Sequence, residues 1–290
     1  MPVRYAGAAR IGGLALFWGS SFLWIKLGLR GFSPVQITAL RLLLGAAVLL
    51  AILRWRGLRL PSGTRLWTHL AVAALFGNAT PYLLFGIAER QVSSSTAGVI
   101  NASAPLWTVL FTVAAYRSGR TVRRNAWSLG LGFLGVVLIF SPWRLGTELM
   151  SGGGAACLGA AVSYGISYVY IGHFLARREL GALPMAAGQL VCATAMVAAA
   201  VPFLGLRTPH WRADSLVAIL ILGVLGTGIT YLLNYRVIAD DGPTAASIVV
   251  YLLPVVSVLL GVLVLGEALR PQVVGGMVLV LVAARLRRTG

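Results

Sequence analysis

One pattern of residues occurs twice in this chain, and each member of the second copy lies 149 residues after its counterpart. The members that recur without any gap are Gly77, Tyr82-Leu83-Leu84, Ala97 and Pro105, which reappear as Gly226, Tyr231-Leu232-Leu233, Ala246 and Pro254. Each copy holds five long apolar runs separated by short polar breaks. Because an odd number of membrane crossings reverses the direction of the next segment, the second copy is expected to lie upside down relative to the first.

Composition indicates that the solvent of this chain is lipid. Hydrophobic residues make up 58% of the sequence and charged residues 11%, whereas a soluble domain carries about 25% charged residues. Runs of roughly 20 apolar residues match the thickness of the hydrocarbon core. Helices satisfy their own backbone groups in lipid, and the alternating segments of a β-barrel are not seen. We therefore expect an all-α integral membrane protein with ten transmembrane helices as two inverted five-helix repeats.

The apolar runs define the expected spans and repeats. The first repeat takes residues 1–142, a linker takes 143–153, and the second repeat takes 154–290. The expected spans are 11–30, 34–53, 66–89, 94–116, 125–142, 154–175, 183–204, 214–238, 244–266 and 271–286.

The basic residues predict the orientation. The net charge is +17, but Lys and Arg gather at the ends of apolar runs, which is typical of cytoplasmic anchoring and argues against nucleic-acid binding. With the N-terminus inside, the inner segments hold sixteen Lys and Arg residues and the outer segments six. We expect a multi-pass protein of the cell (inner) membrane with both termini cytoplasmic. Its expected partners are the bilayer and a small-molecule substrate, with no obligate protein partner.

Inverted repeats are typical of transporters, which hold a substrate near the middle of the bilayer. A membrane enzyme is the main rival class, but no histidine lies centrally beside a serine, and Asp240-Asp241 is the only adjacent acid pair. A channel would be expected to show a ring of charge or a repeated filter loop, and neither is visible. The two cysteines and three histidines have no metal-ligand spacing, so neither a metal nor a cofactor is expected.

Short motifs in the expected order resemble the EamA family of the drug/metabolite transporter superfamily. They are Trp18-Gly19-Ser20-Ser21-Phe22 with Lys26, Pro34, Ala39-Leu40-Arg41, Pro254 and Gly266-Glu267. The resemblance covers nearly the whole chain and implies export of amino acids or related metabolites. Two departures matter. Arg117-Ser118 replaces the Gly-Glu pair that many members carry after the fourth span, and Trp18-Gly19 stands where short four-span relatives carry a proton-coupling Glu.

Three prolines lie inside expected spans, and two of them are related by the repeat. Pro105 and Pro254 occupy matching positions, while Pro81 has no counterpart in the second copy. Proline removes a backbone hydrogen bond and kinks a helix, and the carbonyl left free is tolerated beside a cavity. Paired broken helices are the best sequence pointer to a transport site. Bending for packing alone is the competing interpretation.

Polar and aromatic residues near these kinks form the predicted lining of a cavity suited to an apolar or aromatic metabolite. The predicted substrate-binding residues are Trp18, Lys26, Asn78, Tyr82, Asn101, Ser103, Trp107, Tyr164, Tyr168, Tyr231, Asn234 and Tyr251. Hydrogen bonding between helices is the competing role for the amides and hydroxyls, and interfacial anchoring is the competing role for the aromatics.

The charged residues within or near the spans each have two competing interpretations of their role. Lys26, the only lysine, either snorkels to the headgroups or holds an anionic substrate group. Arg41 lies at a similar depth and is read as a structural charge or a gate, as are His173 and Glu267. No carboxylate lies in the middle of a span, so weak or no proton coupling is expected. The predicted function is a metabolite exporter working by alternating access, with multidrug efflux as the alternative; an importer or an intramembrane enzyme is less favoured.

Overall fold

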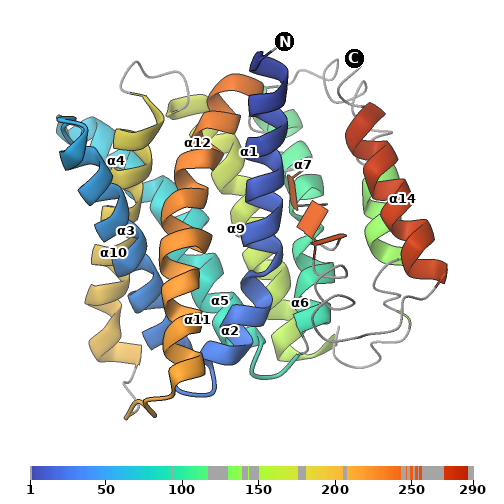
Figure 1. Cartoon of the computed structure of the whole chain (residues 1–290), viewed down its shortest axis with the longest axis horizontal. Coiled ribbons are helices and arrows are strands. Elements are labelled where there is room, and N and C mark those ends of the chain that lie inside the picture. Colours follow the sequence, from blue (N-terminus) through green and yellow to red (C-terminus); the bar gives the residue numbers. More distant parts are fainter. Residues whose placement is uncertain are drawn as a thin grey trace.

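Every regular element in the part of the chain that the computed structural model describes is helical (Figure 1). The described residues are 2–92, 94–116, 130–138, 143, 150–175, 181–204, 208–242, 246, 249–250, 252–253, 255–256 and 271–286. Their helices are α1 (Pro2–Gly19), α2 (Ser21–Gly28), α3 (Pro34–Trp55), α4 (Thr64–Ala74), η1 (Leu75–Ala79), α5 (Thr80–Ala88), α6 (Ser94–Asn101), α7 (Ala104–Tyr116), α9 (Gly152–Phe174), α10 (Ala182–Leu204), α11 (Ala213–Gly223), η4 (Val224–Ile229), α12 (Thr230–Asp241) and α14 (Pro271–Leu286).

Among the described residues, six helical stretches are long and apolar enough to cross a membrane. They are Arg10–Gly28, Pro34–Trp55, Thr64–Ala88, Gly152–Phe174, Ala182–Phe203 and Ala213–Asp240. They coincide with the first, second, third, sixth, seventh and eighth predicted spans. The all-helical class is therefore confirmed for the described residues, and six of the predicted spans have the length and apolar composition of membrane-crossing helices.

The other four predicted spans are described less completely. The predicted span 94–116 forms two helices, α6 and α7, which are separated at Ala102 and Ser103. The tenth prediction matches α14, and residues 130–138 are helical within the fifth. Most of the ninth, 244–266, lies outside the described residues. The full set of ten spans stays a prediction.

The sequence repeat reappears as a repeat of an uncommon helical geometry. The helices η1 and η4 are π-helices that begin at Leu75 and Val224, which are 149 residues apart. The α-helices before them, α4 and α11, begin at Thr64 and Ala213 with the same offset. π-Helical turns are rare in proteins, and those that do occur are often found at functional sites. The two halves thus share a distorted helix at matching positions.

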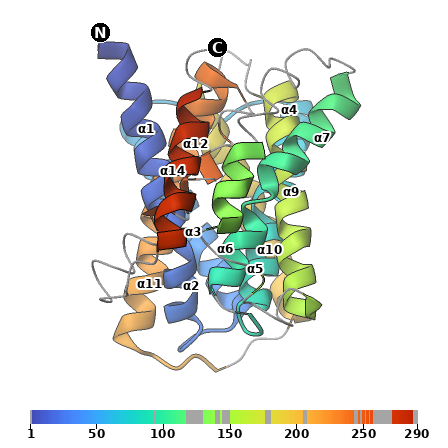
Figure 2. The same ribbon diagram turned by 90° about the vertical axis from the view of Figure 1, so that its right-hand side faces the viewer.

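Helices from opposite halves pair in antiparallel fashion. Arg10 of α1 bonds Asp240 of α12, while Arg30, just after α2, bonds Asp214 of α11. Figure 1 shows α1 beside α12. The second pair is α9 with α4, η1 and α5. The early residue Gly153 of α9 lies against Val92, and the late residue Tyr170 bonds His69 with 2.7 Å between its hydroxyl and Nδ1. The first and third spans of each half therefore contact the third and first spans of the other (Figure 2).

Glycines allow the closest approach between the halves. A Cβ added at Gly45 of α3 would lie 2.8 Å from Cγ2 of Thr227, and one at Gly223 would lie 2.5 Å from Cβ of Leu44. Small residues at helix interfaces permit backbones to approach in membranes, where dispersion contacts and hydrogen bonds replace the hydrophobic effect. The contacts of α3 with α11 and η4 therefore depend on these positions remaining small.

Candidate functional site

A cavity lies where helices from the two halves meet. Its empty volume is about 520 Å³, part of which is open to solvent. Seven of its lining residues were singled out from the sequence: Trp18, Arg41, Tyr82, Asn101, Tyr164, Tyr168 and Tyr231. The walls are mainly aromatic, and the helices α1, α2, α3, α5 and α6 from the first half face α9 and α12 from the second. The structure thus brings together residues that lie far apart in the sequence.

Six further lining residues were not singled out from the sequence: Ser21, Phe22, Ile25, Phe85, Val250 and Leu253. A signal for some of them exists. Residues 18, 21, 22 and 25 have the i, i+3, i+4, i+7 spacing of one helix face, and Tyr82 and Phe85 are three apart. Extending the predicted lining along that period from Trp18 and Tyr82 would have included them.

The guanidinium of Arg41 is the charged group of the described lining. Arg41 is 4% exposed, and its Nε donates a hydrogen bond to Thr227 Oγ1 at 3.2 Å. Its Cζ lies 3.7 Å from the centre of the Tyr82 ring, which is a cation–π contact. The bond to Thr227 joins α3 of the first half to the π-helix η4 of the second. Arg41 therefore lines the cavity and also connects the halves.

Asn101 ends α6 and is a second polar residue of the same lining. Its side chain is 5% exposed, and its Oδ1 has no hydrogen-bond partner among the described residues. A buried amide oxygen without a partner costs roughly 1–3 kcal/mol. Asn101 lies at the break between α6 and α7, where Pro105 is the second residue of α7. Such a break in a membrane is tolerated beside a cavity.

Two backbone carbonyls of the π-helix η1 accept hydrogen bonds from side chains of the second half. Pro81 lacks an N–H group, so one carbonyl about one turn before it loses its backbone donor. Ser163 Oγ donates to the Phe76 carbonyl at 2.8 Å, and the Tyr231 hydroxyl donates to the Gly77 carbonyl. Tyr231 therefore both lines the cavity and secures the distorted helix.

A second polar cluster lies beside η1 and away from the cavity lining. Gln189 of α10 donates from Nε2 to Asn78 Oδ1 at 2.6 Å and to the Ala73 carbonyl at 3.2 Å. Its Oε1 accepts a hydrogen bond from the Tyr235 hydroxyl. Gln189 is fully buried, so these bonds satisfy its amide. Asn78, predicted to bind substrate, thus has a structural partner here. Asn234 is also buried and is not part of the lining.

Lys26 does not reach the cavity. Its Nζ donates to the carbonyls of Glu89 at 2.8 Å and Val92 at 3.1 Å, just after the end of α5. A cation there satisfies carbonyls that have no partner within the helix and faces the negative end of the helix dipole. The geometry thus favours an anchoring role over both snorkelling and substrate binding.

The remaining predicted residues lie elsewhere. Trp107 Nε1 bonds Ser103 Oγ at 3.3 Å beside the α6–α7 break, outside the lining. His173 lies at the end of α9, with its ring 4.4 Å from that of Phe174, also outside the lining. Tyr251, Pro254 and Glu267 lie outside the described residues.

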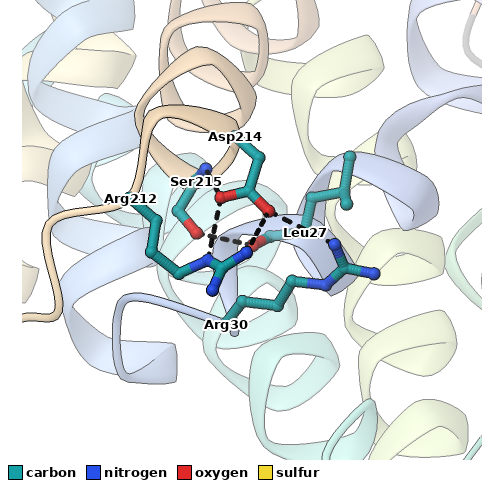
Figure 3. A network of polar contacts seen from close by, with 5 residues as sticks. All are labelled: Leu27, Arg30, Arg212, Asp214 and Ser215. Atoms are coloured by element: carbon teal, nitrogen blue, oxygen red, sulfur yellow. Dashed lines mark hydrogen bonds and ion pairs between the residues drawn. The ribbon is translucent and has the colours of Figure 1, made fainter.

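One end of the bundle carries a polar network that no sequence motif indicates (Figure 3). Asp214 accepts hydrogen bonds from Arg212 at 3.0 and 3.1 Å and from Arg30 at 3.2 Å. Ser215 Oγ donates to the Leu27 carbonyl at 2.9 Å. The hydrogen bond with Asp214 raises the pKa of Arg212. This network joins the end of α2 to the start of α11, across the boundary between the halves.

Comparison with known proteins agrees with this architecture. The sequence profile of the EamA-like transporter family matches twice, over residues 7–141 and 152–287. An uncharacterized transporter of Archaeoglobus fulgidus is 26% identical over 264 residues, covering 87% of this chain and 86% of that protein. The uncharacterized inner membrane transporter YedA of Escherichia coli K12 is 27% identical over 260 residues, covering 88% and 82%.

A protein of solved crystal structure shares the fold. The two structures superpose with a TM-score of 0.77 and share 21% sequence identity. The match covers 97% of this chain and 96% of the other chain. At that identity the likeness speaks for the fold alone. The two profile matches together span most of the sequence, and they agree with the resemblance seen in the motifs. The chain belongs to the EamA-like transporter family.

Proposed function

We propose that this protein is a carrier of the cell inner membrane that exports amino acids or related small metabolites by alternating access. The observation that carries the proposal is the cavity between the halves, lined by aromatic side chains and by Arg41 and Asn101. Concave sites with apolar walls and a few placed polar groups are typical of small-molecule binding. Family membership and the names of the relatives support a transporter rather than an enzyme. The direction of transport rests on the family resemblance.

The inverted arrangement of the two repeats is part of the proposal. The pairing of Arg10 with Asp240 and of Arg30 with Asp214 makes the eighth span antiparallel to the first. The contacts of α9 make the sixth span antiparallel to the third. If successive spans alternate in direction, the first span of one repeat runs opposite to the first span of the other. This supports two copies of opposite orientation. The proposed cytoplasmic side of both termini rests on the distribution of Lys and Arg alone.

The ends of the pair formed by the first and eighth spans suit a two-gate mechanism. Arg10–Asp240 joins the two spans at one end. The network of Arg30, Arg212 and Asp214 joins them at the other end (Figure 3). The cavity residues Trp18 and Tyr231 lie between those ends along the same spans. We expect one end to open while the other stays closed, as the repeats rock about the cavity.

Multidrug efflux is the second candidate, and the aromatic walls favour it. Trp18, Tyr164 and Tyr168 present flat, polarisable surfaces that accept many hydrophobic compounds. A drug carrier needs no specific polar partner, whereas a metabolite carrier uses Arg41 and Asn101. Selectivity among compounds of equal hydrophobicity therefore separates the two functions.

The test is uptake into proteoliposomes containing the purified protein. A panel of labelled amino acids and hydrophobic drugs is screened for saturable uptake, and hits are tested for counterflow from preloaded vesicles. Trp18→Ala is expected to lower uptake about tenfold or more, because it removes a wall of the cavity. Trp55→Ala is the matched control, since Trp55 is 84% exposed and lies outside the lining. Currents through single channels, or a complete lack of counterflow for every hit, would contradict a carrier.

A further inference from the structure

The charge of Arg41 has no acidic counterpart in the described structure. The ion pairs found there are Arg10–Asp240, Arg30–Asp214 and Arg212–Asp214, and Arg41 takes part in none of them. Arg41 is nevertheless 4% exposed. Burying a guanidinium is costly unless it is paired, and a charged residue inside a membrane usually faces a cavity or a partner. The protein therefore keeps a positive charge in its cavity at a cost to its own stability.

The contacts of Arg41 leave most of its hydrogen-bonding capacity unused. A guanidinium has five N–H donors in a planar fork. The bond from Nε to Thr227 uses one of them, and no hydrogen bond joins Nη1 or Nη2 to a residue that the structure describes. The Tyr82 ring 3.7 Å from Cζ offers attraction through its face but no acceptor. The outer edge of the fork is thus available to a ligand in the cavity.

The surroundings of this fork favour a ligand that carries a single small anionic group. Among the described lining residues, Arg41 is the one charged residue, and the others are aromatic or aliphatic except Ser21 and Asn101. The fork of an arginine matches a carboxylate with two parallel hydrogen bonds. Asn101 also lines the cavity, and its buried Oδ1 has no partner in the described structure, so a ligand that reached it would satisfy it with an N–H or O–H donor.

We propose that the cavity selects substrates that carry one carboxylate, which pairs with Arg41, on an aromatic or apolar body. This rests on the proposed function and deepens it by naming the substrate class. The guanidinium packs against the Tyr82 ring and bonds Thr227. A bound carboxylate neutralises it and lowers the cost of its burial. Arg41 thereby becomes a substrate-binding residue that determines specificity.

The test is binding of matched pairs that differ only in the charged group. Purified wild-type protein in detergent is titrated with 3-indolepropionate and 3-indolepropionamide, and with L-tryptophan and L-tryptophanamide. Affinity is read from the ligand-dependent rise in melting temperature, which grows with ligand concentration over Kd. We expect each carboxylate to bind about 10- to 100-fold more tightly than its amide, in line with one charge-assisted hydrogen-bonded contact.

Variants assign the preference to Arg41. Arg41→Gln is expected to remove the preference for carboxylates, and Arg41→Lys to retain part of it because the charge remains. Arg90→Gln changes an exposed arginine outside the lining and is expected to leave the preference intact. The comparison within wild type does not depend on whether a variant folds. Equal affinity for acid and amide, or no binding of any of the four compounds at millimolar concentration, would overturn the proposal. Counterflow of the substrates found in the wider screen would still establish the carrier. Failure of the carboxylate preference can therefore be told apart from failure of the proposed carrier function.

Discussion

Tyr231 of the second half donates a hydrogen bond to the backbone carbonyl of Gly77 in the first half. Gly77 lies in the π-helix η1, four residues before Pro81. Tyr231 is the second residue after the matching π-helix η4. A carbonyl deprived of its backbone donor in one repeat is thus satisfied by a side chain from the other. The hydroxyl belongs to a residue that also lines the cavity, so the distortion of η1, the contact between halves and the candidate site depend on one another.

The first prediction concerns this bond. Tyr231→Phe leaves the Gly77 carbonyl without its donor and is expected to lower the free energy of unfolding by about 1–3 kcal/mol. Pro81→Ala restores an N–H group near that carbonyl, so the cost of Tyr231→Phe should shrink in its background. The measurement is a double-mutant cycle of thermal stability in detergent. Tyr164→Phe, which also changes a cavity tyrosine, serves as control. Equal costs in both backgrounds would show that Pro81 and Tyr231 are not coupled.

The second prediction concerns Lys26. Because its ammonium bonds the carbonyls of Glu89 and Val92, Lys26→Ala should lower the melting temperature. It should leave the KM of any transported substrate within about twofold, since it removes no group from the cavity lining. Lys26→Arg retains the charge and is expected to recover most of the stability. A large rise in KM at unchanged stability would show that Lys26 takes part in substrate binding.

The third prediction concerns close packing between α7 and α9. A Cβ added at Gly165 would lie 2.6 Å from Trp107 Cβ and 3.0 Å from the Thr108 backbone nitrogen. Gly165→Ala is therefore expected to destabilise the protein by about 1–3 kcal/mol through overpacking. Gly12→Ala is the matched control, because a Cβ at Gly12 meets nothing within 4 Å. Thermal unfolding of both variants in detergent checks the difference, and equal melting temperatures would contradict the close approach.

The fourth prediction concerns the two gates. Asp240→Asn weakens the contact with Arg10, and Asp214→Asn weakens the contacts with Arg30 and Arg212. Exposed ion pairs contribute little, so each change should shift the balance between open states only about two- to fivefold. The two shifts should have opposite signs, because the pairs lie at opposite ends of the same two spans.

Labelling measures this balance. Ser21 lines the cavity and is close in size to cysteine, so Ser21→Cys is placed in a background where Cys157 and Cys192 are replaced by alanine. A membrane-impermeant thiol reagent is added to either side of oriented vesicles. We expect Asp240→Asn to speed labelling from the side of Arg10 and Asp214→Asn to speed it from the other side. Acceleration from the same side in both variants would contradict a two-gate arrangement.

Much of this fold could be predicted from the sequence, because the repeat and the apolar runs are local signals. Six of the expected spans coincide with helices long and apolar enough to cross a membrane. The offset of 149 residues seen in Gly77 and Gly226 recurs in the starts of η1 and η4. Aromatic residues placed deep inside spans, such as Tyr168, do line the cavity. The π-helical turns at these positions could not be predicted, since they carry contacts from the other half: Ser163 and Tyr231 bond carbonyls of η1, and Arg41 bonds the Thr227 side chain in η4.

The sequence by itself determined that this chain is a helical membrane protein built from a duplicated unit. Only the tertiary structure decided which face of each helix meets the cavity. It directs Arg41 into the cavity and Lys26 onto the end of α5, and it pairs Asn78 with Gln189. The physical reason is that lipid and protein interior are both apolar, so a spanning helix is hydrophobic on every side and carries no polar face to mark its orientation. Contacts between distant spans supply that information, and they exist only once the bundle is assembled.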